Sequence, residues 1–264
     1  MPLPKIKYPL QSIRLPTFPD DEVIIRPYTT KEEVVLLLGG QNDDSRNKML
    51  AIEQVINNCI VKAPKYINTD TLSIPDIEFI FMKLRMISYS NLLSLSYSPE
   101  SEECLGKRAK ENDEFGPCEG TVPFLIDLND VDFSSPIDPT IHRGVVNVKL
   151  SDEMSVDISY PKLKDKDNFD ACMEAKNPDP VAANNLLSSV ITTVYDGEQI
   201  FKAEEDFTPQ EMSEFCESLT LQMKKDIFSV IINVPKMVVR TDIVCKRCKM
   251  SVPYKIEGIE SFFV

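Results

Sequence analysis

Apolar side chains recur every three or four residues over much of the chain, which is the spacing of one face of an α-helix. In the first ninety residues the pattern predicts three helices, which begin near Thr29, Asp44 and Ser73. Thr30 and Glu33 have capping-box spacing at the first of these starts. The apolar positions of the second and third helices are Met49, Ile52, Val55, Ile56, Cys59, Ile60, Ile77, Phe81, Leu84 and Ile87. We expect these side chains to form a core.

A second helical region is predicted nearer the C-terminus. Asp179 followed by Pro180 is a typical helix start, and Thr208 with Glu211 is another capping box. A further helix is predicted over residues 221–232, before a proline at position 235. The expected apolar positions of the first two helices are Leu186, Leu187, Val190, Ile191, Val194, Met212, Phe215, Cys216 and Leu219.

Extended segments are predicted in four parts of the chain. The first thirty residues hold six prolines, which indicates an extended arm that ends in a short hairpin around residues 16–21. Strands are expected over residues 122–128, 145–150 and 155–160, with a loop at 132–143, and residues 197–202 also read as extended. Two more extended stretches lie on either side of Cys245-Lys-Arg-Cys248.

The cysteines carry the clearest chemical pattern. Cys245 and Cys248 are spaced to put two thiolates on one side of a tight turn, as a tetrahedral metal requires. Cys104 and Cys118, which bracket an acidic segment, could supply the other two sulfurs. We therefore predict a structural zinc site of Cys104, Cys118, Cys245 and Cys248, which would tie the middle of the chain to its end. Free or redox-active cysteines are the alternative, because Cys-x-x-Cys also occurs as a redox pair.

The remaining three cysteines are not expected to bind metal. Cys59 and Cys216 fall on apolar helical faces, where a buried cysteine behaves as a small apolar residue. Cys172 shows no distinctive pattern. A disulfide framework is disfavoured, since the count of seven is odd and no signal peptide is recognised.

These elements predict an α+β fold, in which a helical body carries a small antiparallel sheet and a discontinuous zinc-ribbon-like corner of four cysteines. We expect one structural unit built from five regions. They are a proline-rich arm and hairpin (1–28), an N-terminal helical region (29–98), a cysteine insertion with strands (99–160), a C-terminal helical region (161–236), and the ribbon corner with its tail (237–264).

Composition narrows the classes of function. The chain has a net charge of −13 and a pI near 4.7, which opposes a general affinity for nucleic acid. Only Lys246, Arg247 and Lys249 make a small basic tip beside the last cysteine pair. No apolar run of about eighteen residues is present, so no membrane span is expected. The first residues lack the apolar core of a signal peptide, and we expect the protein in the cytosol where it is made.

No catalytic constellation can be assembled from the sequence. The chain has one histidine, His142, and eight glycines, none in a phosphate-binding pattern. Nothing positions a nucleophile beside a base. We therefore expect no enzymatic activity.

Several stretches, taken in their order along the chain, resemble one known family. They are residues 8–33, 118–120, 124–131, 191–197, 215–220, 227–235, 245–248 and 258–263. The order of these parts is similar to that of the baseplate hub assembly proteins of T-even-type tailed bacteriophages, over nearly the whole chain. The family tends to have a close Cys-x-x-Cys at the first pair, whereas an acidic insertion separates Cys104 from Cys118 here. This departure bears on Cys104 more than on the other three ligands.

The resemblance implies a non-enzymatic role. It points to a hub protein of the phage tail baseplate, or to an assembly factor (a chaperone) for the hub, that acts by binding other hub proteins of the same phage. It implies a place in the host cytoplasm during assembly, and in the virion tail baseplate if the protein is retained. The alternative is a zinc-ribbon regulator that contacts nucleic acid or the transcription machinery through Lys246, Arg247 and Lys249. The oligomeric state is left open.

Overall fold

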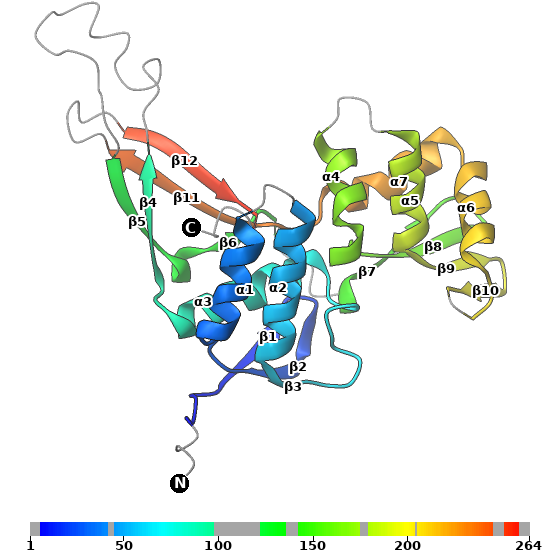
Figure 1. Cartoon of the computed structure of the whole chain (residues 1–264). Coiled ribbons are helices and arrows are strands. Elements are labelled where there is room, and N and C mark those ends of the chain that lie inside the picture. The colour runs from blue at the N-terminus through cyan, green and yellow to red at the C-terminus, as the bar shows by residue number, and fades with distance from the viewer. Residues whose placement is uncertain are drawn as a thin grey trace, which may run out of the picture.

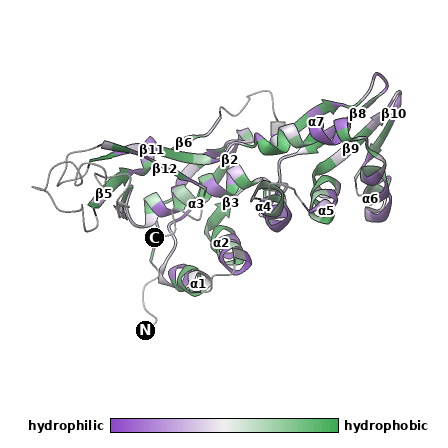
Figure 2. Ribbon diagram, turned by 90° about the horizontal axis from the view of Figure 1, so that it is seen from above, coloured by the Kyte–Doolittle hydropathy of each residue, from purple (hydrophilic) through white to green (hydrophobic). Residues whose placement is uncertain are grey.

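The computed structural model describes residues 6–41, 45–97, 122–135, 142–174, 179–203, 205–244 and 251–258 of the 264-residue chain. These residues form three parts, which lie in a row when the molecule is seen from above (Figure 2). We call them the paired hairpins, the N-terminal lobe and the C-terminal lobe. Each part has its own cluster of buried apolar side chains. The fold class is α+β, as the sequence predicted.

The N-terminal lobe packs three helices with a three-stranded sheet of order β1-β2-β3 (Figure 1). Its elements are β1 (Gln11–Leu15), β2 (Phe18–Ile25), α1 (Thr30–Gly40), α2 (Ser45–Cys59), β3 (Ile60–Lys62) and α3 (Ile74–Ser88). The apolar side chains that the helical spacing singled out are inside this lobe: Ile52, Val55, Ile56, Ile77 and Leu84 are at most 1% exposed. The structure thus confirms the hairpin and the three helices predicted for this region.

The paired hairpins are two antiparallel strand pairs that lie side by side (Figure 1). One consists of β4 (Leu92–Tyr97) and β5 (Val122–Asp127), after which the chain makes the 3-10 turn η1 (Leu128–Asp130). The other consists of β11 (Met237–Val244) and β12 (Ser251–Glu257), with β6 (Asp132–Phe133) added beside the start of β11. Their shared core contains Met82, Leu93, Ile126, Leu128, Met237, Val239 and Ile256.

The C-terminal lobe places helices on a four-stranded sheet of order β10-β9-β8-β7. Its strands are β7 (Val145–Lys149), β8 (Met154–Ser159), β9 (Ile191–Asp196) and β10 (Gln199–Lys202). Its helices are α4 (Lys166–Glu174), α5 (Pro180–Val190), α6 (Pro209–Ser218) and α7 (Leu221–Ile232), and it also has the 3-10 turns η2 (His142–Gly144) and η3 (Leu163–Asp165). Side chains of the sheet and of all four helices meet in a second core, which includes Val156, Ile158, Phe169, Leu186, Val190, Cys216, Ile227 and Ile231.

Helix α3 is the element that the three parts have in common. Its residues Ile77, Ile80, Phe81 and Leu84 belong to the N-terminal core, Ile74 to the C-terminal core and Met82 to the hairpin core. A helix that is apolar on most sides is normally buried in this way. The positions of the lobes therefore depend on one central helix.

Two hydrogen bonds donated by backbone N–H groups fasten both other parts to α3. The Ile74 N–H donates to the carbonyl oxygen of Pro161 at 3.0 Å, which joins the C-terminal lobe to the start of the helix. The Glu78 carboxylate accepts the N–H of Met237 at 2.9 Å, which joins the first residue of β11 to the same helix. Both contacts are long-range in sequence, so no local pattern announces them.

Five elements differ from the prediction or were not anticipated by it. Ile60, predicted to lie on the second helix, instead begins the short strand β3, because α2 ends at Cys59 and Ile60 pairs with Ile25 of β2. The helix predicted to carry Ile191 and Val194 ends at Val190, and both residues lie in β9, where they pair with β8. The β-branched run from Ile191 to Val194 suits a strand better than a helix. A short strand, β6, lies inside the predicted loop 132–143, and β4 and α4 were not predicted at all.

The sheet architecture is a further correction. The prediction of one small sheet was wrong, because the strands of the described residues form four separate sheets. The sheets are separate because their apolar faces are buried in three different cores, those of the N-terminal lobe, the C-terminal lobe and the paired hairpins. None of the helices in the described residues is long and apolar enough to cross a membrane.

Candidate functional site

The four predicted metal ligands, Cys104, Cys118, Cys245 and Cys248, lie outside the described residues. The structure does describe the strands that lead to them. Tyr97 at the end of β4 is paired with Val122 at the start of β5, and Val244 at the end of β11 is paired with Ser251 at the start of β12. Both segments that carry the cysteines are therefore connected to the open ends of antiparallel strand pairs.

Aromatic contacts bring these two open ends together. The ring of Tyr254 in β12 meets the ring of Tyr97 edge-on, with centroids 5.6 Å apart, and that of Phe124 in β5 with centroids 5.5 Å apart. Edge-to-face pairs at this distance are favourable beyond the area that they bury. They place the end of the β4–β5 hairpin beside the end of the β11–β12 hairpin.

This arrangement fits the four-cysteine ligand set. Cys245 follows Val244 directly and Cys248 precedes Ser251 by three residues, whereas Cys118 lies four residues before Val122 and Cys104 lies seven residues after Tyr97. An extended chain spans up to about 3.5 Å per residue, so each of these connections is long enough to reach a common point beyond the hairpins. In the described part of the chain, no group of three or more His, Cys, Asp or Glu side chains could hold a metal ion.

The other three cysteines are in the apolar interior. Cys59, Cys172 and Cys216 are free and at most 5% exposed. Burial raises the pKa of all three thiols, that of Cys59 to about 11. A thiol with a raised pKa is a poor nucleophile and a poor metal ligand, because the thiolate is the reactive form. The structure confirms the prediction that Cys59 and Cys216 pack as small apolar residues.

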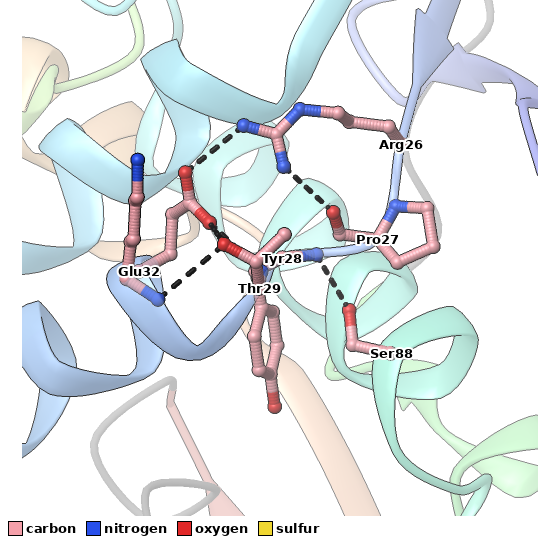
Figure 3. A network of polar contacts seen from close by, with 7 residues as sticks. Arg26, Pro27, Tyr28, Thr29, Glu32 and Ser88 are labelled. Carbon is pink, nitrogen blue, oxygen red and sulfur yellow. Dashed lines mark hydrogen bonds and ion pairs between the residues drawn. The ribbon is translucent and has the colours of Figure 1, made fainter. Parts of the chain in front are cut away.

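A polar network that the sequence did not predict holds the start of α1 (Figure 3). One carboxylate oxygen of Glu32 accepts from the Arg26 guanidinium at 2.9 Å, and the other accepts the Thr29 N–H at 2.8 Å. The Arg26 backbone N–H also donates to the carbonyl oxygen of Cys59, and the Tyr28 N–H donates to Ser88 Oγ at 2.9 Å. These contacts join the end of β2 to α1, to the last residue of α2 and to α3.

The true helix cap therefore lies one residue earlier than predicted. Thr29 is the N-cap and Glu32 completes the capping box, in place of Thr30 and Glu33. Both pairs have the same spacing, and the ion pair between Arg26 and Glu32 favours the pair Thr29–Glu32. Although burial raises the pKa of the Glu32 carboxyl, hydrogen bonds from Arg26 and Thr29 outweigh it and lower that pKa to about 2.

A second buried carboxylate fastens the first hairpin to α3. Asp76 is fully buried and accepts the N–H of Thr17 at 3.0 Å and the hydroxyl of Thr17 at 2.5 Å, as well as the N–H of Ser73 at 3.2 Å. Thr17 lies in the turn between β1 and β2. Burial raises the pKa of Asp76 even though these hydrogen bonds oppose the shift. Asp76 thus acts as a structural group that fixes the turn to the central helix.

Comparison with known proteins gives a match over most of the chain. A family model described as T4 bacteriophage base plate protein matches residues 11–264. Searches of the curated proteins and of the solved structures return no significant match. The family match begins at the first residue of β1 and includes all three parts of the structure.

Proposed function

Since this chain belongs to the T4 bacteriophage base plate protein family, we propose that it acts by protein–protein binding, either as a subunit of the baseplate hub or as an assembly factor for that hub. The observation that carries the proposal is the extent of the family match, which includes every described strand and helix. The order of sequence motifs, similar to that of hub assembly proteins, supports the choice of the hub within the baseplate.

The use of the buried carboxylates supports a role without catalysis. Glu32, Asp76 and Glu78 are each at most 5% exposed, and each accepts a backbone N–H. Carboxylates that act in catalysis are found in clefts with groups that leave room for a substrate. Glu78 lines a cavity with Lys166 and Lys236, but its carboxylate accepts the N–H of the first residue of β11. All three carboxylates join one segment of the chain to another, as expected of a protein that presents surfaces to partners.

A structural zinc ion is part of the proposal. Cys104, Cys118, Cys245 and Cys248 would hold it, and the side-by-side hairpins support this assignment because the strand ends that lead to both cysteine pairs lie beside each other. Four thiolates are a typical ligand set for structural zinc. When bound, the ion would supply no reaction chemistry but would tie the two hairpins together, and its binding free energy would add to the stability of the fold.

The proposed place of action follows from the proposed role. A hub subunit or a hub assembly factor meets its partners in the host cytoplasm while the tail is built. A subunit then stays in the virion baseplate, whereas an assembly factor leaves. Both roles need the same recognition of hub proteins.

The test is an affinity purification of the tagged full-length chain from a lysate of infected cells, with bound proteins identified by mass spectrometry. Recovery of baseplate hub proteins is the expected result, and a search for the chain in purified particles then separates a subunit from an assembly factor. Recovery of only RNA polymerase or nucleic acid would contradict the proposal and favour the regulator. A variant with Lys246, Arg247 and Lys249 changed to Ala is the matched control, because only the regulator depends on these cations.

A further inference from the structure

Helix α1 carries apolar side chains on its outer face. Five consecutive residues, Val34 to Leu38, are apolar, so they point in all directions around the helix. Val34, Leu37 and Leu38 are 48%, 61% and 58% exposed. Their spacing of three and four residues puts them on one side of the helix. We call these three side chains the α1 ridge.

The ridge is not explained by the packing of α1 within its own chain. Only Glu32 and Gly39 of this helix are buried, and Val35 and Leu36 are half-buried against the N-terminal core. Its position is set instead by the Arg26–Glu32 ion pair and the capping box at one end, and by the close approach of Gly39 to Ala51 at the other. A helix that is apolar on all sides is normally buried on all sides. We therefore expect a surface from outside the lobe to pack against the α1 ridge.

A second uncovered apolar feature lies at the N-terminal arm, by which we mean residues 6–10. The arm is extended, and its apolar side chains alternate: Ile6, Tyr8 and Leu10 are 74%, 41% and 59% exposed. Alternate side chains of an extended segment point to the same side. The arm runs outward from the lobe, beyond the start of β1 (Figure 1). Ile6 and Leu10 are therefore more than half uncovered by their own chain, and Tyr8 is partly covered.

The root of the arm is placed near the start of α1. The Arg26 guanidinium, which pairs with Glu32 of α1, also lies over the Tyr8 ring at 5.8 Å from its centroid. One arginine thus contacts both the arm and the helix that carries the ridge. Within one chain, however, the described arm does not lie on the ridge, since both remain exposed.

Charge favours a second copy of this chain as the occupant. Residues 1–10 contain Lys5 and Lys7 and no carboxylate, whereas the chain as a whole has a net charge of −13. A basic arm is attracted to an acidic body, and this attraction opposes the repulsion between two acidic copies. The arm and the ridge each present three apolar side chains.

We propose that the N-terminal arm of one copy lies across the α1 ridge of a second copy, in a dimer in which both arms are exchanged. Two-fold symmetry makes each contact occur twice, which doubles the buried area. The doubling matters because a stable interface buries about 800 Å² per partner, more than one short arm can cover. The inference concerns association of the chain with itself, and it is tested on the purified protein independently of the hub partners.

The first experiment is sedimentation velocity on the purified full-length chain and three variants. The wild type is expected to sediment as a dimer, whereas Ile6→Asp in the arm and Leu37→Asp in the ridge should each raise the dissociation constant by at least about tenfold. Leu221→Asp is the matched control, because Leu221 in α7 is 81% exposed and belongs to neither surface. A monomeric wild type, or a dimer that neither the arm nor the ridge variant weakens, would overturn the proposal.

A second experiment separates exchange between copies from an arm that folds back on its own chain. Normal and ¹⁵N-labelled chains are mixed, treated with an amine-reactive cross-linker and digested, and the Lys7–Lys31 cross-link is examined by mass spectrometry. Lys7 is in the arm and Lys31 is in the first turn of α1. Cross-links that join a light and a heavy chain support the exchange. Cross-links within single chains are expected in either case, because Arg26 already holds Tyr8 and Glu32 close together within one chain. Cross-links within single chains only would refute the exchange.

Discussion

At the scale of single residues, three buried carboxylates stabilise this protein by joining segments of the chain. Asp76 accepts the N–H of Thr17, and Glu78 accepts the N–H of Met237. Glu32 differs because it also has a cationic partner, Arg26, whose side chain is 21% exposed. Removing one partner of such a contact leaves the other unsatisfied, which costs more than the contact itself contributes.

Replacement of Glu32 is predicted to make stability less dependent on pH. The pKa of Glu32 is about 2 in the folded protein, against about 4.3 for an unperturbed glutamate. A lowered pKa means that the stabilisation is complete above the unfolded value and is lost as pH falls from about 4.3 to 2. Glu32→Gln should therefore cost about 2 kcal/mol at pH 7, after allowance for solvent around Arg26, and less than half of that at pH 3.

Urea unfolding at the two pH values, followed by circular dichroism because the chain has no tryptophan, measures this difference. Glu33→Gln is the control, since Glu33 is exposed in the same helical turn. An equal loss of stability for Glu32→Gln at pH 7 and pH 3 would contradict the assigned role of the ion pair.

At the scale of elements, the close packing of two helices explains one of the glycines that end α1. Consecutive glycines after an apolar run are a helix stop signal in the sequence. A Cβ atom at Gly39 would lie 2.5 Å from Cβ of Ala51 in α2, closer than two carbon atoms can pack, whereas a Cβ at Gly40 meets nothing within 4 Å. Gly39 thus has a second role, which is to let the helices approach.

The two glycines should therefore respond in opposite ways to the same substitution. Gly39→Ala is expected to lower the free energy of unfolding by about 1–3 kcal/mol, because α1 and α2 must move apart. Gly40→Ala should be neutral or stabilise by up to about 1 kcal/mol, because alanine favours the helical backbone. Thermal unfolding of both variants measures the effect, and similar melting temperatures would show that the helices do not need the close contact.

The contact between the paired hairpins makes another prediction at this scale. Tyr254 meets both Tyr97 and Phe124, so Tyr254→Ala should reduce stability by about 1–2 kcal/mol and loosen the β4–β5 hairpin. Hydrogen exchange of the backbone amides of Leu93 and Ile126 reports this loosening. Tyr89→Ala, at a side chain that is 78% exposed, is the control. Unchanged exchange in Tyr254→Ala would show that the aromatic contacts do not hold the hairpins together.

At the scale of the whole molecule, three cores are organised around α3, and the proposed zinc ion would close the end of the molecule farthest from the C-terminal lobe. Two hairpins with only a small core between them gain much from such a link, because small units bury too little apolar area to be stable alone. The proposed zinc ion and the packing between the hairpins would thus both stabilise this part of the molecule.

Cys245→Ser is predicted to remove the bound zinc and to lower the melting temperature by about 5 °C or more. Elemental analysis of the purified chain measures the metal, and a thermal scan measures the stability. Cys216→Ala is the matched control: Cys216 is fully buried in the C-terminal core, so this variant should lose stability but keep its zinc. Full zinc content in Cys245→Ser would exclude this ligand.

Local rules account for what could be predicted from the sequence alone. Helical spacing and caps placed α2, α3, α6 and α7 within a few residues, and the extended flanks of Cys245 and Cys248 correspond to β11 and β12. These features depend on side chains three or four residues apart in a helix, or on alternation along a strand. They can therefore be recognised in short stretches of sequence. The order of motifs, which indicates the phage baseplate family, is likewise a property of the sequence by itself.

Only the tertiary structure decided the features that depend on distant partners. Arg26 favours Thr29 over Thr30 as the cap of α1, and pairing with β8 turns Ile191–Val194 from a predicted helix into a strand. The run Val34–Leu38 is apolar throughout, but the lobe covers only one side of it. Burial and strand pairing each require two segments of the chain that meet. The sequence of one segment does not specify which other segment packs against it.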